Sequence, residues 1–187
     1  PLDLNPDIVQ LMGSVTCESI SSTPQAVVTS LAEMFHGHAD FLNLPLYIPN
    51  DYVRETLCND ANNSVILKKG IFCDKVIASI GTMGKIRESD YWRGSMPPEI
   101  YKDLVEKGAC GSILGRFFDA NGQELACDWN EKSISLSIQQ LRNISDVVIV
   151  ASPVSKAPAL LAALKGDFIN TLITDGTTAT RILNEAK

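Results

Sequence analysis

The sequence predicts an α/β domain built on a doubly wound, mostly parallel sheet, with one β-hairpin as an excursion from it. Three observations carry this prediction. Strand-like and helical patterns alternate along the second half of the chain, the connections between them are short, and an Asn-Gly turn separates two strand-like runs. Alternating strands and helices with short connections imply parallel pairing through right-handed crossovers.

The first half is expected to follow the same alternation. Residues 7–12 form an apolar run that ends at Gly13-Ser14, which predicts the first strand. Thr23-Pro24 opens a helix that runs to about His36, since proline is tolerated at an early helical position. The next predicted elements are a strand over 40–44, short helices near 50–59 and 62–70, and a buried strand over 75–80 ending at Gly81-Thr82.

The predicted hairpin lies in the middle of the chain. Residues 112–118 and 124–127 are strand-like, and Asp119-Ala120-Asn121-Gly122 lies between them. An Asn-Gly pair between two such runs is a strong signal for a tight turn between antiparallel strands.

The second half has the clearest pattern. A continuous apolar, mostly β-branched run over 146–151 predicts a strand covered on both faces. A helix is expected from Lys156 to Lys165, with Ser155 as its N-cap, Pro158 in its first turn and Gly166 as its stop. The remaining predicted elements are a strand over 170–174, a turn at 175–176 and a helix over 177–186.

Composition limits the possible classes of protein. The 187 residues include 16 Lys+Arg and 22 Asp+Glu, a formal charge of −6, with 45% hydrophobic and 20% charged residues. These values fit one compact domain and exclude a mostly disordered chain. No apolar run approaches the roughly 18 residues of a membrane helix, and the first residues lack a secretory signal. The acidic balance argues against a nucleic-acid surface on this chain.

Cysteine and histidine give no metal-site pattern. The odd number of cysteines and their wide spacing favour reduced, buried thiols in the cytoplasm over a disulfide framework. His36 and His38 flank Gly37 at a predicted helix end, with no third ligand at helical spacing. No metal or cofactor is expected, and phosphate-loop, dinucleotide and nucleophile-elbow motifs are absent. The five cysteines are Cys17, Cys58, Cys73, Cys110 and Cys127.

Candidate binding residues follow from the predicted sheet. In a parallel sheet, ligands bind beyond the carboxyl ends of the strands. Small residues there let backbone N–H groups approach a ligand, although a glycine after a strand is also an ordinary turn residue. The positions selected in this way are Gly13-Ser14, Leu46-Tyr47, Gly81-Thr82, 152–156 and 175–176.

Two charged residues are stronger candidates. Lys156 lies in the first turn of a predicted helix, where a cation opposes the helix dipole, so it binds either an anionic ligand or a neighbouring carboxylate. Asp119 begins the predicted turn. Its carboxylate either accepts hydrogen bonds from the turn backbone, which the local pattern favours, or accepts them from sugar hydroxyls.

Together, several motifs resemble the effector-binding domain of the SorC/DeoR-type sugar-responsive transcriptional regulators of bacteria. The resemblance is collinear over nearly the whole chain. The motifs that carry it are IVQLMGS at 8–14, SIGT at 79–82, GSILGRFFDANG at 111–122, LRNI at 141–144, KA at 156–157, AALKG at 162–166, and NTLITD at 170–175 with Ala179.

This resemblance implies a three-layer α/β/α, Rossmann-like fold similar to phosphosugar isomerases and deaminases. It also implies a cytoplasmic homo-oligomer, a dimer or tetramer, in which a phosphorylated sugar or related metabolite controls operator binding. By similarity, Asp119 contacts sugar hydroxyls and Lys156 contacts a carbonyl, hydroxyl or phosphate oxygen. The remaining implied contacts are Gly13, Ser14, Gly81 and Thr82 in the pocket lining, and Leu46 and Tyr47 in an apolar wall.

Compared with the family, residues 1–187 correspond to the effector-binding domain without its first strands, and the helix-turn-helix domain that contacts DNA is absent. Two alternatives stay open. An active phosphosugar isomerase or deaminase would need a base poised near neutrality and a second acid or base within reach. A scaffold or oligomerisation domain with a vestigial pocket would need neither.

Overall fold

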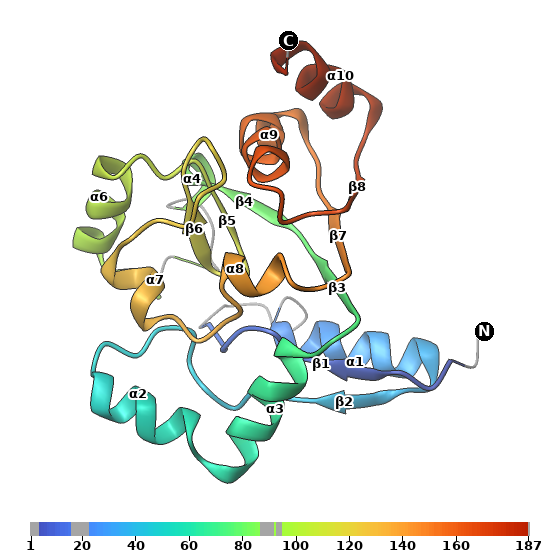
Figure 1. The fold of residues 1–187 in the computed structure, drawn as a ribbon, viewed down its shortest axis with the longest axis vertical. Coiled ribbons are helices and arrows are strands. Elements are labelled where there is room, and N and C mark those ends of the chain that lie inside the picture. The colour runs from blue at the N-terminus through green and yellow to red at the C-terminus, as the bar shows by residue number, and fades with distance from the viewer. Residues whose placement is uncertain (1–3, 16–22, 87–91, 93–94, 187) are drawn as a thin grey trace.

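The computed structural model describes residues 4–15, 23–86, 92 and 95–186, which form a mixed α/β fold with three small sheets (Figure 1). Two sheets are parallel and one is antiparallel. The parallel sheets are β1 (Asp7–Val9) with β2 (His38–Asp40), and β3 (Lys75–Ala78), β7 (Asp146–Val150) and β8 (Thr171–Ile173) in the order β3-β7-β8. The antiparallel sheet has β4 (Ile80–Thr82), β5 (Gly111–Ile113) and β6 (Arg116–Phe118) in sequence order.

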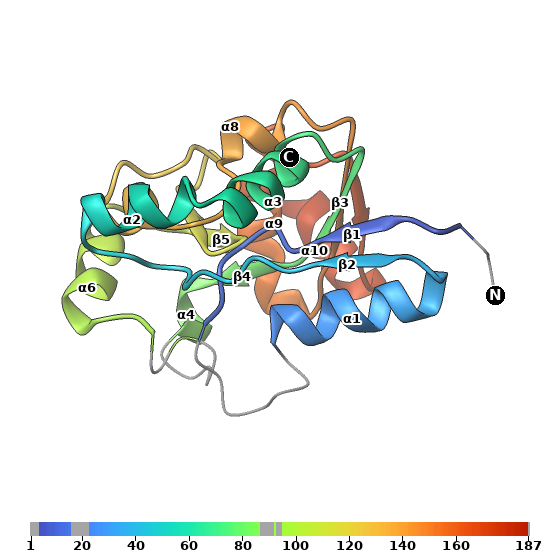
Figure 2. The ribbon, with the colours of Figure 1, turned by 90° about the horizontal axis from the view of Figure 1, so that it is seen from below.

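Helices pack against these sheets from different sides (Figure 2). Helix α1 contacts β1 and β2, whereas α9 contacts β4, β5 and α10. The helices are α1 (Pro24–Phe35), α2 (Asp51–Cys58), α3 (Ala61–Ile71), α4 (Met83–Ile86), α6 (Pro98–Glu106), α7 (Asp128–Lys132), α8 (Ile138–Leu141), α9 (Ala157–Lys165) and α10 (Gly176–Glu185).

Local capping explains why the helix predictions for the first half are confirmed. The Thr23 side chain accepts a hydrogen bond from the Ala26 N–H, Pro24 occupies the first turn of α1, and His36 ends the helix in a left-handed conformation. Asn50 and Asp60 cap α2 and α3 in the same way. Each cap satisfies an N–H group that the first turn of a helix leaves without a partner.

The strand predicted over 40–44 is wrong. The pairing with β1 ends at Asp40, and the chain then passes through isolated bridges. The alternating apolar residues Leu42 and Leu44 are buried in a separate cluster with Ile48 and Ile134. Burial in this cluster gives the segment the alternating apolar pattern of a strand, although it has no strand partner. Periodicity alone cannot distinguish such a buried loop from a strand.

The strand predicted over 75–80 continues further and changes partner. It pairs in parallel with β7 through β3, and after Ser79 it pairs in antiparallel fashion with β5 through β4. Gly81-Thr82 therefore lies inside a strand, which corrects the strand end predicted there. Glycine fits this position because a Cβ atom on Gly81 would lie 2.5 Å from the Ser112 Oγ.

The hairpin prediction is confirmed only in part, because the second strand predicted over 124–127 is reduced to an isolated bridge at Glu124. The run 112–118 is itself a hairpin, because β5 and β6 are joined by Leu114 and Gly115 with φ values of 49° and 79°. Two positive φ angles are the geometry of the tightest hairpin turns. The predicted Asn-Gly turn follows directly, closed by the bridge between Phe118 and Glu124.

The start of α9 also differs from the prediction. A short 3-10 turn over Val154–Lys156 precedes the helix, and Lys156 occupies the N-cap position without a side-chain cap bond. Ser155 is therefore not the cap, because the 3-10 turn moves the start of the helix to Ala157. Pro158 in the first turn and Gly166 at the end of the helix are as predicted.

The strand over 146–151 is confirmed as β7, but the double coverage predicted for it is wrong. Val147 and Ile149 are buried in the main core, where α9 packs. On the opposite face of β3-β7-β8, Ile77 is 57% exposed, Val150 48% and Ile173 54%. Within the described residues this sheet has one covered face and one open apolar face, so the three-layer arrangement is incomplete.

The described cysteines are free, and burial raises the pKa of each thiol. A raised pKa disfavours the reactive thiolate form. Cys17 lies outside the described residues. Among those residues, no set of three potential ligands could hold a metal ion, and none of the helices is long and apolar enough to cross a membrane.

Candidate functional site

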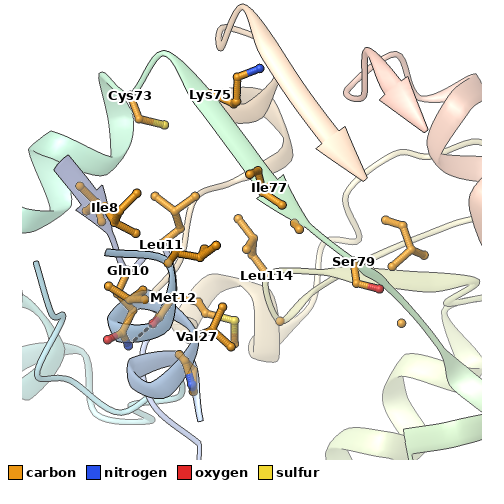
Figure 3. Close-up of a pocket in the computed structure, with 18 of the residues that line it drawn as sticks. Ile8, Gln10, Leu11, Met12, Val27, Cys73, Lys75, Ile77, Ser79 and Leu114 are labelled. Atoms are coloured by element: carbon orange, nitrogen blue, oxygen red, sulfur yellow. Dashed lines mark hydrogen bonds between the residues drawn. The ribbon is translucent and has the colours of Figure 1, made fainter. Parts of the chain in front are cut away.

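A groove of about 590 Å³ opens between α1 and β1 on one side and β3 and β4 on the other (Figure 3). The segment after β1, the β5–β6 turn and Lys156 complete its lining. Most of the lining is apolar, and Figure 3 shows Ile8, Leu11 and Val27 on one wall opposite Ile77 and Leu114. The volume is within the range of small-molecule sites in proteins.

One part of the groove is polar. Ser79 lies between β3 and β4, Gly81 and Ser112 pair across β4 and β5, and Lys156 precedes α9. The Lys156 Nζ donates a hydrogen bond to the Ser79 Oγ at 3.2 Å. Burial lowers the pKa of Lys156, and no carboxylate among the described residues pairs with it. A partly desolvated cation without a countercharge favours an anionic ligand.

The β5–β6 turn is held in the groove wall by a buried tryptophan. The Trp129 indole N–H donates a hydrogen bond to the Gly115 carbonyl oxygen at 2.7 Å. Gly115 has a φ of 79°, and a Cβ atom there would lie 2.7 Å from the Leu46 Cδ2. Both the backbone conformation and the close packing therefore require glycine at this position.

Comparison with known proteins decides the family. The family model described as "Putative sugar-binding domain" matches residues 5–184. The chain belongs to this family. This assignment agrees with the predicted resemblance to the SorC/DeoR-type regulators, since the relatives are transcriptional regulators.

The sugar-binding domain is 28% identical over 179 residues to the deoxyribonucleoside regulator of Bacillus subtilis, covering 96% of this chain and 56% of that protein. The full-length sorbitol operon regulator SorC from Klebsiella pneumoniae matches with a TM-score of 0.90 and 22% identity, over 98% of this chain and 59% of that one. The sugar-binding domain spans about half the length of the curated relatives that it matches.

One solved structure corresponds to an isolated domain. It comes from a transcriptional repressor of Vibrio fischeri and carries the same description as the family model. The match has a TM-score of 0.85 and 23% identity, and it covers 97% of the sugar-binding domain and 71% of that chain. At this identity the likeness establishes the shared fold.

Of the residues predicted for the binding site, Gly81 and Lys156 line the groove of the sugar-binding domain. Thr82 does not line it, because it lies one residue further along β4 and pairs with Gly111. Sequence reasoning missed Ser79 and Ser112. Ser79 could have been found by counting back from Gly81, whereas Ser112 enters the groove through antiparallel pairing that no local pattern indicates.

Gly13 and Ser14 do not line this groove, and their backbone groups pack against neighbouring segments. The Gly13 N–H donates to the Ile134 carbonyl oxygen at 2.8 Å, and the Ser14 N–H donates to that of Leu44 at 2.7 Å. A Cβ atom on Gly13 would lie 2.5 Å from the Pro45 carbonyl oxygen. The small residue Gly13 thus allows two backbone segments to approach each other closely.

Leu46 and Tyr47 contact the core cluster around Trp129, and neither residue lines the groove. Leu46 is 2% exposed, and the Tyr47 ring stacks on Trp129 with centroids 4.7 Å apart. The Tyr47 hydroxyl donates to the Asp128 Oδ2 at 2.6 Å. Burial and this carboxylate raise the pKa of Tyr47 to about 12. The pair fixes α7 and Trp129, which in turn hold the groove's β5–β6 turn.

Asp119 does not line the groove, and the structure does not bring it together with Lys156. Its Oδ1 accepts hydrogen bonds from the N–H groups of Asn121 and Gln123 at 2.8 and 2.9 Å. The same turn packs on the end of α9 through Gly122. Lys156 precedes the other end of this nine-residue helix, about 13 Å away along its axis. The observed contacts are those of a turn residue.

Proposed function

We propose that this chain is the effector-binding domain of a bacterial transcriptional regulator of carbohydrate utilisation. The effector is a phosphorylated sugar or a related anionic metabolite. It binds at the polar part of the groove, where Ser79 and Ser112 face sugar hydroxyls and Lys156 faces the anionic group. The single observation that carries the proposal is Lys156, a partly buried ammonium group in a groove with a hydroxyl partner and no described carboxylate partner.

Control of transcription is proposed to act through other parts of the protein. The formal charge of −6 disfavours direct contact between this chain and the DNA phosphates. A helix-turn-helix domain outside this chain binds the operator, and the effector changes the arrangement of a cytoplasmic homo-oligomer, a dimer or tetramer. The completed domain has the three-layer α/β/α fold of phosphosugar isomerases and deaminases.

A sensing role is preferred over catalysis, as the names of the relatives suggest. Isomerisation of a sugar phosphate needs an acid and a base that both reach the substrate. Lys156 is the titratable group at the polar part of the groove, and no described Asp, Glu or His accompanies it there. Turnover of a sugar phosphate, followed by NMR, would overturn this choice.

A thermal-shift panel of sugar phosphates and free sugars tests the proposed ligand class on the full-length regulator. A ligand at 100 times its Kd should add about 2.7 kcal/mol to the free energy of unfolding. Lys156→Met should remove most of this shift, because the anion loses its charge partner. Lys165→Met, which changes an exposed lysine at the other end of α9, is the matched control and should keep the shift. An equal shift in the Lys156→Met and wild-type proteins would contradict the proposed site.

Two variants of Asp119 separate a ligand contact from a turn contact. Asp119→Asn retains the Oδ1 acceptor, so the unliganded melting temperature should stay near that of wild type. Asp119→Ala leaves two N–H groups without their acceptor and should lose about 1–2 kcal/mol. Because Asp119 lies away from the groove, both variants should keep the ligand-induced shift. Loss of that shift in Asp119→Asn would restore the direct contact with sugar hydroxyls that the family resemblance implies.

A further inference from the structure

The turn between β5 and β6 contains an aliphatic residue in a backbone conformation that aliphatic residues avoid. Leu114 has a φ of 49°, in the left-handed region. Among the described residues, the other non-glycine positions with positive φ are Asn5, His36 and Asp167, whose residue types tolerate this conformation. The tight hairpin turn formed by Leu114 and Gly115 ordinarily has asparagine, aspartate or glycine at its first position. Leucine is strained there, and backbone strain of this kind is concentrated at functional sites.

The surrounding structure holds this strained turn in place. Ile113 and Arg116, which flank it, pair across β5 and β6. The Gly115 carbonyl oxygen accepts the hydrogen bond from the Trp129 indole N–H at 2.7 Å. A strained residue persists where its neighbours determine its conformation in this way. The side chain of Leu114 is therefore held at a fixed place in the groove that it lines.

Leu114 adjoins the polar part of the groove. The antiparallel register pairs Ile80 with Ile113, and continuing it by one residue places Leu114 across from Ser79. Ser79 accepts the hydrogen bond from the Lys156 Nζ at 3.2 Å, and Leu114, Ser79 and Lys156 all line the groove. Figure 3 shows Leu114 between Ser79 and the opposite wall. Leu114 therefore lies where the apolar part of the groove meets the polar part.

Packing in the core accounts for only part of this side chain. Leu114 is partly buried against the main core cluster, and the rest of its surface faces the groove. Glycine or asparagine would form the same turn without strain. The leucine side chain thus has a contact in the groove that the turn itself does not need.

We propose that Leu114 determines which sugar phosphates fit at the polar part of the groove, because its side chain closes that part and excludes longer sugar chains. This size limit rests on the proposed function, since it concerns the effector that binds at Lys156. The anionic end of a sugar phosphate faces Lys156, and its hydroxylated chain extends past Ser79 toward Leu114. The isobutyl group of Leu114 offers that chain neither a hydrogen-bond donor nor an acceptor.

The position of Leu114 sets the size class of the effector. Directly opposed residues of antiparallel strands have Cβ atoms about 5 Å apart, so the Leu114 side chain begins within roughly 10 Å of the Lys156 Nζ. A triose or pentose phosphate fits within this span, whereas an extended heptose phosphate exceeds it. The effector is therefore a short-chain sugar phosphate.

The test measures the dissociation constants of three compounds by calorimetry: glyceraldehyde 3-phosphate, ribose 5-phosphate and sedoheptulose 7-phosphate. The full-length regulator should bind one of the two shorter phosphates more tightly than the heptose phosphate. In Leu114→Ala the affinity for the heptose phosphate, relative to that shorter phosphate, should rise at least about tenfold, because a small change in an apolar contact has an effect of this size on discrimination. The ratio of two dissociation constants in one folded protein does not depend on its stability.

Three further variants control for packing and folding. Leu161 on α9 is also partly buried against the main core cluster but does not line the groove, so Leu161→Ala should lower the melting temperature and keep the wild-type ratio. Leu114→Met retains an apolar side chain of similar volume and should also keep the ratio. Leu114→Gly removes the side chain and the backbone strain together, so it provides the same comparison if Leu114→Ala does not fold.

The outcomes separate the size limit from effector binding. Wild-type protein that binds a short sugar phosphate, with the same ratio in Leu114→Ala and Leu114→Gly, overturns the role of Leu114 and leaves the effector site in place. An equal change of the ratio in Leu161→Ala, or a wild-type preference for the heptose phosphate, also overturns this role alone. A regulator that binds none of the three compounds overturns the proposed effector class, and the size limit with it.

Discussion

Replacing Arg116 by methionine should destabilise the domain by about 3 kcal/mol, the lower end of the cost of removing one partner of a buried ion pair, because the Arg116–Glu124 pair is partly buried. The Arg116 side chain is 13% exposed, and its Nη1 lies 2.7 Å from the Glu124 Oε1. The guanidinium group also donates to the carbonyl oxygens of Asn130, Ser133 and Ser135 at 2.8–3.3 Å. Methionine fills a similar volume but leaves the carboxylate and the carbonyl groups without these donors.

This network ties β6 to the segment that follows α7. Glu124 also accepts a hydrogen bond from the Ile138 N–H at 2.7 Å, at the start of α8. Urea unfolding followed by circular dichroism measures the loss. Arg181→Met is the matched control, because Arg181 forms an exposed pair with Glu185 one helical turn away on α10. Its cost should be below about 0.5 kcal/mol. Equal losses in the two variants would show that the Arg116 network has little net effect on stability.

Trp129→Ala should also cost about 3–5 kcal/mol, because it empties a large volume in a packed core. Trp129 is 1% exposed and lies against Tyr47, Trp92 and Phe117. Its indole N–H is bonded to Gly115, so the substitution also releases the β5–β6 turn from the groove wall. The loss is measured by chemical denaturation, and Tyr52→Ala at a 79% exposed position should change stability little.

Trp129→Phe separates packing from the hydrogen bond. Phenylalanine keeps most of the apolar contact with Tyr47, so the free energy of unfolding should fall by only about 1–3 kcal/mol. Because the Gly115 carbonyl oxygen loses its donor, the turn that contributes Leu114 to the groove becomes less firmly held. A weaker ligand-induced thermal shift than in wild type is therefore expected. An unchanged shift would show that the turn is fixed by Leu46 and the strand pairing alone.

The sequence predicted most elements because their signals are local. Thr23, Asn50, Asp60 and Asp175 are cap residues that mark helix starts within a few positions. The wrong predictions have a different origin. Leu42 and Leu44 alternate like strand residues but are buried in a loop cluster, and the 3-10 turn before α9 moves the cap away from Ser155.

The candidate site was predictable only in part. Lys156 and Gly81, which line the groove, were identified because apolar periodicity and the positions of glycine and proline indicate where a helix begins and a strand ends. Ser79 and Ser112 were missed, since the switch of partner from β7 to β5 after Ser79 depends on residues far apart in sequence. Tyr47 was assigned to the groove because no local pattern shows that its ring stacks on Trp129.

The sequence by itself predicted the family resemblance, the mixed α/β class and the longer helices α1, α2, α3, α9 and α10 to within a few residues, and it singled out Lys156 before α9 as a candidate. These follow from short motifs, caps and apolar periodicity, which act over one or two helical turns. Only the tertiary structure decided that Asp119 and Lys156 lie at opposite ends of α9, and that β1 and β3 lie on two sides of one apolar groove, each pairing with one strand among the described residues. Strand pairing joins distant segments through backbone groups that every residue carries, so side-chain patterns do not encode it.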